Sequence, residues 1–162
     1  MGVTTGSPQS VTWSTSDAQG CTYSGSIDVY VQALVGGYNT AKFHDHCALA
    51  TSGTTYDFGG LVEVSASPTD ATWQASCSLS FYGSSNCTGS VVSTASADIT
   101  SIFSPPDGGS GAATFQWTPF LSSALAPGGA QSFFFGCFVA SDGTQAHLWF
   151  DMFYATKAPG TY

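Results

Sequence analysis

Short runs of alternating polar and apolar residues recur along the chain. In residues 26–34, SIDVYVQAL, apolar residues at every second position alternate with Asp28, Tyr30 and Gln32. This two-residue period is typical of a β-strand that buries one face. Segments rich in Gly, Pro, Ser and Asp, such as SPPDGGSGA and APGGA, separate the runs as turns do. Because no segment shows a convincing helical period, the pattern predicts an all-β protein.

The alternating runs predict eight or nine strands. They cover residues 10–13, 26–34, 41–50, 54–67, 75–83, 89–99, 112–120, 130–140 and 147–155. Antiparallel strands with one apolar face bury that face when two sheets pack against each other, so we predict an antiparallel β-sandwich. We expect one sandwich domain over residues 11–157, a flexible linker over residues 1–10 and a tail over residues 158–162.

Composition supports this fold class and limits the partners. Aromatic residues make up 14% of the chain and charged residues only 7%, which favours strands over surface helices and argues against disorder. Lys42 and Lys157 are the only lysine or arginine residues, and the net charge is −8. Nucleic acids and anionic membranes require clustered Lys and Arg, so we expect neither as a partner. No apolar run approaches the roughly 20 residues of a membrane span.

Five cysteines are typical of an exported protein, secreted or held at the cell surface. Cys77 and Cys87 flank a strand and a turn, and we predict that they form one disulfide. We predict a second disulfide between Cys21 and Cys47. Cys137 would then be a buried free thiol, although a Cys47–Cys137 pair also stays open. The opening MGVTTGSPQS lacks the apolar run of a signal peptide, so we read it as the start of a mature fragment.

Two rows of polar and aromatic side chains suit a carbohydrate ligand. Sugars offer hydroxyl groups for hydrogen bonds and C–H patches that stack on aromatic rings. The two rows consist of Asp28, Tyr30 and Gln32, and of Lys42, His44 and His46. They form one groove if their strands pair or face the same concavity. Trp117 and Trp149 are further stacking candidates, and a solvated sheet face is the alternative interpretation of both rows.

Four segments, in this order, resemble the galactose-binding-like jelly roll of bacterial carbohydrate-binding modules. They are GSIDVYV after a SDAQG loop, CALATSGTTYDFGGLVEV, CSLSFYGSSNCTG and LAPGGAQSFFFGCFVASDGTQAHLWFDMFYA. The resemblance covers about residues 11–156 and implies a jelly-roll sandwich. The sequence departs from the family in two respects. The N-terminal Asn-Gly and Glu signature of many such modules is missing, and Leu61 stands where tryptophan is common.

Asp151 is a lone carboxylate in the largely apolar segment AHLWFDMFYAT. The resemblance implies a structural calcium ion here, because the aspartate of the last strand binds calcium in many of these modules. Asp17, in TSDAQG, could supply another ligand. A hard cation with oxygen ligands is chemically suited to such a carboxylate. The alternative is that Asp151 accepts hydrogen bonds from backbone amides or a hydroxyl, with no metal.

Signatures of catalysis are missing from the sequence. It has no Gly-x-Ser-x-Gly, His-Glu-x-x-His or phosphate-loop motif, and Glu63 is its only glutamate. A metal-dependent enzyme would need a pocket that joins the closely spaced His44 and His46 with His147, which lies far from them in sequence. We therefore predict a non-catalytic carbohydrate-binding module, a monomeric unit of a larger chain, that binds polysaccharide or glycan. A structural or adhesive β-sandwich with a protein partner is the alternative, and it would expose a contiguous apolar patch.

Overall fold

Eleven strands and one helical turn form the described part of the chain in this computed structural model. That part comprises residues 2–5, 9–15, 18–20, 25–31, 39–44, 47–64, 73–103, 116–141 and 146–159. The strands are β1 (Gly2–Thr5), β2 (Gln9–Ser14), β3 (Ser26–Val31), β4 (Asn39–His44), β5 (Ala48–Leu49), β6 (Thr55–Val64), β7 (Trp73–Tyr82), β8 (Val91–Asp98), β9 (Thr118–Leu125), β10 (Ser132–Ser141) and β11 (Ala146–Lys157). The helical turn α1 (Thr100–Phe103) follows β8, and no described helix is long and apolar enough to cross a membrane.

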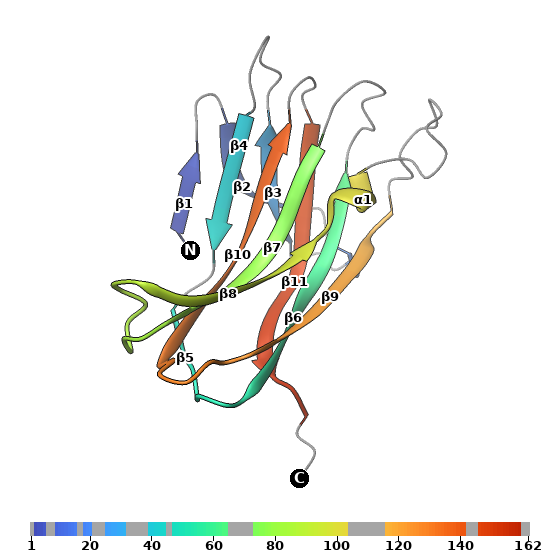
Figure 1. Cartoon of the computed structure of the whole chain (residues 1–162). Helices are drawn as coiled ribbons and strands as arrows, with labels where there is room; N and C mark the ends of the chain where they lie inside the picture. Colours follow the sequence, from blue (N-terminus) through green and yellow to red (C-terminus); the bar gives the residue numbers. More distant parts are fainter. Residues whose placement is uncertain are drawn as a thin grey trace.

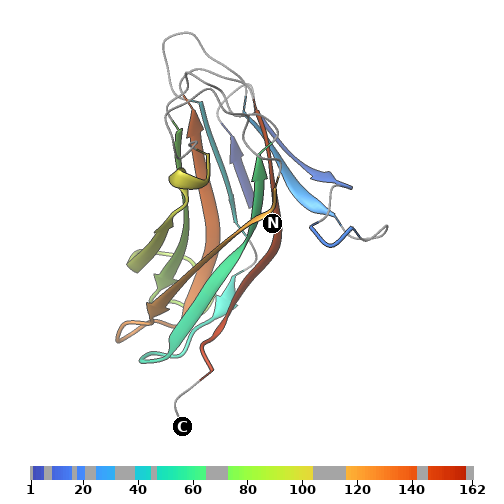
Figure 2. The same cartoon turned by 90° about the vertical axis from the view of Figure 1, so that its right-hand side faces the viewer.

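Two antiparallel sheets pack face to face, and they appear as separate layers when the molecule is turned (Figure 1, Figure 2). One sheet has six strands, in the order β1-β4-β10-β7-β8 with β5 paired to β10. The other has five strands, in the order β2-β3-β11-β6-β9. Strands that follow each other in the chain, such as β3 and β4, often lie in different sheets. The predicted antiparallel β-sandwich is therefore confirmed, and its topology is that of a jelly roll.

The described strands are more numerous than the eight or nine predicted. The predicted run over residues 41–50 is divided into β4 and β5, and β1 lies where a linker was expected. The linker prediction for residues 1–10 is wrong, because β1 pairs with β4 and β2 begins at Gln9 and pairs with β3. These six- and four-residue strands contain no long apolar run, so their polar sequences resembled a linker.

Phenylalanine rings from both sheets meet in the centre of the core. Phe153 lies within 5.0–6.0 Å, centroid to centroid, of four other rings. The four are Phe43, Phe120, Phe135 and Phe150. Burying each such side chain contributes about 1.5–3 kcal/mol, so this cluster is a major part of what holds the two sheets together.

An irregularity in β11 brings Phe153 into the core. Asp151 pairs with Leu61 but Tyr154 pairs with Gly59, so β11 has one residue more than β6 over this stretch. Met152 takes up the extra residue with φ of 51°, a conformation uncommon for a non-glycine residue. As a result Phe153 faces the core and Tyr154 faces outward.

The cysteines pair differently from the prediction. Cys77 is bonded to Cys137, and Cys47 is bonded to Cys87. Cys77 and Cys137 lie directly opposite each other on β7 and β10, with both side chains buried. A Cys77–Cys87 bond was expected because the two residues flank one turn. Cys77 instead lies mid-strand, five residues before the end of β7, which is a separation of roughly 17 Å from that end.

The second disulfide also replaces a predicted one. Cys47 precedes β5, and Cys87 lies in the connection between β7 and β8, with the two Cα atoms 5.8 Å apart. Because Cys47 is bonded to Cys87, the predicted Cys21–Cys47 bond is wrong, and so is the assignment of Cys137 as a free thiol. Cys21 itself lies outside the described residues.

Candidate functional site

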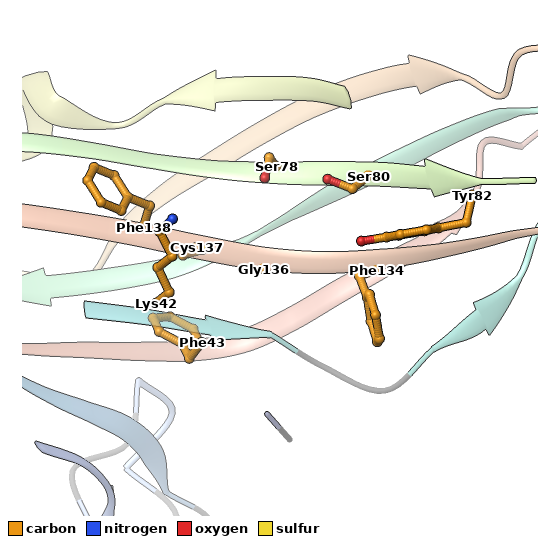
Figure 3. A pocket seen from close by; sticks show the side chains of 9 residues that line it. All are labelled: Lys42, Phe43, Ser78, Ser80, Tyr82, Phe134, Gly136, Cys137 and Phe138. Atoms are coloured by element: carbon orange, nitrogen blue, oxygen red, sulfur yellow. The ribbon is translucent and has the colours of Figure 1, made fainter. Parts of the chain in front are cut away.

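The outer face of the six-stranded sheet carries a groove centred on Gly136. Side chains alternate along β10, so Phe134, Gly136 and Phe138 point outward while their neighbours fill the core. The same alternation on β7 directs Ser78, Ser80 and Tyr82 to this face. We call the depression that these residues form, together with Lys42 on β4, the Gly136 groove (Figure 3). Its volume is about 430 Å³.

Gly136 makes the groove possible because it places no side chain between two phenyl rings. Phe134 and Phe138 lie two residues on either side of it, so they are separated by roughly 13 Å along the strand. Both rings are partly exposed. Tyr82 packs edge-on against Phe134, with ring centroids 5.7 Å apart, and its hydroxyl points back toward the middle of the groove (Figure 3).

Hydroxyl groups line the β7 side of the groove. Ser78 lies opposite Gly136, and Ser80 lies opposite Phe134. The next strand continues this polar surface, since the Ser80 and Thr94 hydroxyls are 3.1 Å apart and Ser78 pairs with Ser96. The groove therefore offers apolar rings and small hydrogen-bonding groups side by side.

Lys42 marks the Phe138 end of the groove. It is exposed, it pairs with Phe138 across the β4–β10 ladder, and its Nζ lies 5.4 Å from the centroid of that ring. This distance is within the range of a cation–π contact. The contact holds the ammonium group beside the groove. Without it, the long lysine side chain would sample many rotamers.

The Cys77–Cys137 disulfide lies under the groove. Both cysteines point inward from the two strands that carry its floor, and Cys137 directly follows Gly136. The bond fixes β7 and β10 to each other at the level of Gly136. A binding surface built on cross-linked strands is held in place before the ligand arrives, which lowers the ordering cost of binding.

A second polar and aromatic surface lies on the outer face of the five-stranded sheet. His147 Nδ1 contacts both carboxylate oxygens of Asp28 at 2.9 and 3.0 Å. The His147 ring lies 4.8 Å from Tyr30 and 6.0 Å from Trp149, centroid to centroid. Glu63 pairs with Trp149 from the other side. We call these five residues the Trp149 face.

Glu63 lies on the Trp149 face, opposite Trp149 on the neighbouring strand. It is partly buried, and this burial raises the pKa of its carboxyl group above the ordinary value. Removal from water disfavours the ionised form, which explains the direction. On the six-stranded sheet, hydrogen bonds from Thr100, first from its side chain and then from its amide, lower the pKa of Asp98.

The sequence-predicted ligand residues are divided between the two faces. Asp28, Tyr30 and Trp149 lie together on the Trp149 face. Trp117 directly precedes Thr118, the first residue of β9, which pairs with Val62 of β6 next to Glu63. His44 lies on β4 in the other sheet. The predicted groove that joins both rows is therefore not formed, because β3 and β4 belong to sheets whose outer faces point in opposite directions. Gln32 and His46 lie outside the described residues.

The assignment of β3 and β4 to different sheets also concerns the histidine pocket that a metal-dependent enzyme would need. His44 is on β4 and His147 is on β11, which belong to different sheets. Among the described residues no group of three or more His, Cys, Asp or Glu side chains could hold a metal ion. His44 and His147 therefore do not share a sheet, and His46, the third histidine of that pocket, lies outside the described residues.

Sequence reasoning missed most of the Gly136 groove. Of its residues only Lys42 was named in advance. The segment SFFFGCFVA is apolar on both of its faces, which is typical of a strand covered on both sides. The available signal was the sequence Phe-x-Gly-x-Phe on one face, next to a strand with serine at every second position. Only the pairing of β10 with β7 brings these two patterns together.

Asp151 accepts hydrogen bonds from two backbone amides. The Ala18 amide donates to Oδ2 at 3.0 Å, and the Met152 amide donates to Oδ1 at 2.6 Å. Among the described residues, Asp151 belongs to no group of three or more His, Cys, Asp or Glu side chains that could hold a metal ion. The two amides satisfy the carboxylate in the way that the alternative interpretation expects. Asp17 lies outside the described residues, so calcium bound with its help stays a prediction.

The two amide contacts of Asp151 should contribute to the stability of the fold. Asp151→Ala should lower the free energy of unfolding by about 1–3 kcal/mol, because it leaves the partly buried Ala18 amide and the exposed Met152 amide without an acceptor. Thermal unfolding followed by circular dichroism measures this loss. On the amide interpretation, EDTA leaves the unfolding temperature of the wild-type protein unchanged. A fall with EDTA that added calcium reverses would contradict it and support a metal held by Asp151 and Asp17.

Comparison with known proteins bears on the fold. No protein-family profile matches the chain, and no curated protein matches its sequence. Among solved structures, a family 61 carbohydrate-binding module in complex with β-1,4-galactotriose superposes with a TM-score of 0.51 at 8% identity, over 96% of this chain and 87% of that one. The CBM22-1 xylan-binding domain of Xyn10C from Paenibacillus barcinonensis gives a TM-score of 0.52 at 10% identity, over 99% and 88%. The fold is the jelly roll of carbohydrate-binding modules.

The same jelly roll also occurs inside larger proteins. The enzymatically active domain of tailspike protein 4 from bacteriophage CBA120 matches with a TM-score of 0.61 at 13% identity, over 96% of this chain. The chain spans only 19% of that protein. At identities this low the likeness concerns the fold, so the site must be argued from the side chains that this jelly roll presents.

Proposed function

We propose that this chain is a non-catalytic module that binds a polysaccharide or oligosaccharide in the Gly136 groove. The observation that carries the proposal is the pair of phenyl rings on either side of Gly136, flanked by the hydroxyls of β7. Sugar rings present C–H patches that pack on aromatic faces, and their hydroxyl groups exchange hydrogen bonds with serine and tyrosine. The roughly 13 Å between the two phenylalanines suits an elongated glycan segment better than a single sugar ring.

Three further observations support the proposal. Two similar jelly rolls are described by what they bind, one with β-1,4-galactotriose and one as a xylan-binding domain. None of the residues that line the groove is a carboxylate, so this site lacks the acid pair that glycoside hydrolysis requires. The two disulfides favour a secreted or cell-surface protein, since such bonds persist in oxidising compartments.

Affinity electrophoresis through gels that contain neutral or acidic polysaccharides tests the proposal. Phe138→Ala removes one ring from the groove and should weaken retention of the bound polysaccharide about tenfold, because most binding energy comes from a few aromatic contacts. Tyr30→Ala is the matched control, since it removes a partly buried aromatic ring from the opposite sheet. We expect it to leave retention unchanged.

The two variants also distinguish the sites. If retention is lost in Tyr30→Ala and kept in Phe138→Ala, the ligand binds instead at Asp28, Tyr30 and Trp149, as predicted from the sequence. If no polysaccharide retains the wild-type protein, and it also binds nothing on a broad glycan array, glycan binding is contradicted altogether. Circular dichroism of each variant shows whether it has kept its fold.

A surface for a protein partner is the second candidate function. Four apolar side chains are exposed on β9 and on the part of β11 that follows Asp151. They are Leu121 (67% exposed), Leu125 (64%), Met152 (51%) and Tyr154 (39%). Tyr154 and Leu121 both pair with Gly59, so they lie close together on this sheet. This apolar surface supports the adhesive alternative, and absence of glycan retention would favour it.

A further inference from the structure

Resting on the proposed function, we propose that Lys42 makes the Gly136 groove selective for glycans that carry a carboxylate group. The recognised unit is a hexuronate placed at the Phe138 end of the groove, within a chain of otherwise neutral sugars. Lys42 is then a specificity-determining residue, while the phenyl rings and hydroxyls bind the neutral part of the ligand.

The position of Lys42 is notable because positive charge is so scarce in this protein. The chain has ten acidic residues and only two lysines, with no arginine. One of the two lysines lies beside the groove, over Phe138. Lys157, the other one, is at the end of β11 in the opposite sheet. In a chain with a net charge of −8, an ammonium group at the groove is therefore a local exception.

The ammonium group of Lys42 is positioned and still available. Its Nζ lies 5.4 Å from the Phe138 centroid, so the side chain extends along the groove end and does not point away into solvent. No carboxylate of the described residues lies within ion-pair distance of it. Of the described carboxylates, the nearest on this face by strand register is Asp98. It lies three strands away, through Phe138 and Ser76, at roughly 14 Å.

The described carboxylates are concentrated on the opposite sheet. Asp28, Asp57, Glu63 and Asp151 lie on β3, β6 and β11, which all belong to the five-stranded sheet. Asp98 is the one described carboxylate on the six-stranded sheet. Among the described charged groups, Lys42 is the one beside the Gly136 groove, and the acidic residues of the five-stranded sheet lie on the far side of the core. By these groups an anionic ligand is disfavoured less at the groove than on the opposite sheet.

The net charge of the protein limits how acidic the ligand can be. A polymer with a carboxylate on every sugar would be repelled by the protein as a whole, and one lysine offsets little of that repulsion. A glycan with isolated uronates brings one carboxylate to Lys42 and only neutral sugars to the rest of the groove. This argument selects sparsely acidic polysaccharides over polyuronates.

The test uses matched pairs of polysaccharides in affinity electrophoresis. Gellan and glucuronoxylan, which both contain sparse glucuronate, are each compared with the same polymer after chemical reduction of its carboxyl groups. For the wild-type protein we expect three- to fivefold tighter retention by the native member of at least one pair, which is the size of an exposed ion pair. Lys42→Met should reduce this ratio to about one, and Lys42→Arg should keep it.

Lys157→Met is the matched control. It removes one positive charge, as Lys42→Met does, so both variants have the same net charge and differ only in where the charge was lost. We expect Lys157→Met to keep the wild-type preference. Equal retention of native and reduced polymers by the wild-type protein, or equal effects of the two methionine variants, would overturn the selectivity proposal while glycan binding stands. Retention of neither member of any pair would instead count against the proposed function, and the selectivity proposal would fall with it.

Discussion

Gly136→Leu is expected to abolish glycan retention while the protein stays folded. The leucine side chain would point outward into the space between Phe134 and Phe138 and fill the groove. A glycine inside a strand weakens it, so leucine at this outward position should leave the unfolding temperature unchanged or raise it slightly. Affinity electrophoresis and thermal unfolding of the same preparation measure the two effects. We expect retention to fall more than 100-fold, to background, because the ligand cannot approach both rings.

The control for this prediction is Gly128→Leu, in the exposed turn before β10. A Cβ atom at Gly128 meets nothing within 4 Å, and the residue does not adopt a positive φ, so leucine fits there without strain. We expect normal retention for this variant. Unchanged retention in Gly136→Leu would show that the ligand binds elsewhere, even if the chain does bind glycans.

Replacing both Cys77 and Cys137 with alanine is expected to cause a large loss of stability. Their bond joins residues 60 apart in sequence, and removing a cross-link of this kind costs about 2–4 kcal/mol. For a domain of this size the unfolding temperature should fall by roughly 4–16 °C. The groove strands β7 and β10 would also lose their covalent link, so retention of glycan should weaken as well.

Differential scanning calorimetry measures this loss. The matched variant replaces Cys47 and Cys87, whose bond spans 40 residues and joins the β5 region to the turn after β7. We expect a comparable fall in unfolding temperature for that variant with little change in glycan retention. Peptide mapping without reduction should find Cys77 linked to Cys137. Detection of a Cys77–Cys87 peptide, or an unfolding temperature insensitive to loss of the Cys77 and Cys137 thiols, would contradict the structure.

Local alternation was enough to predict most of the strands, although β1 was missed and β4 and β5 were predicted as one run. The pattern SIDVYV predicts β3, and the described strand places Val29 and Val31 in the core with Asp28 and Tyr30 outside. A two-residue period determines which residues share a face, whatever the neighbouring strand is. The class of fold follows from the same property, because several one-sided strands without helices require a second sheet to cover them.

Strand order was not predictable in this way, and the errors follow from it. Cys77 was assigned to the nearest cysteine in sequence, but its partner is set by the strand that β7 pairs with. The two polar rows were assigned to one groove because β3 and β4 are consecutive, yet the chain crosses to the other sheet between them. The Gly136 groove combines two strands 50 or more residues apart in sequence. Pairing over such distances depends on the whole topology and leaves no local signal.

The extra residue at Met152 divides the last strand into two halves with separate registers. The first half pairs with β3 from Ala146 to Phe150 and with β6 from Leu148 to Asp151. The second half, from Tyr154 to Lys157, pairs with β6 alone. Because the surplus residue is accommodated between them, neither half inherits its side-chain orientation from the other. Trp149 and Tyr154, which an unbroken two-residue alternation would place on opposite faces, therefore both lie on the outer face of the sheet.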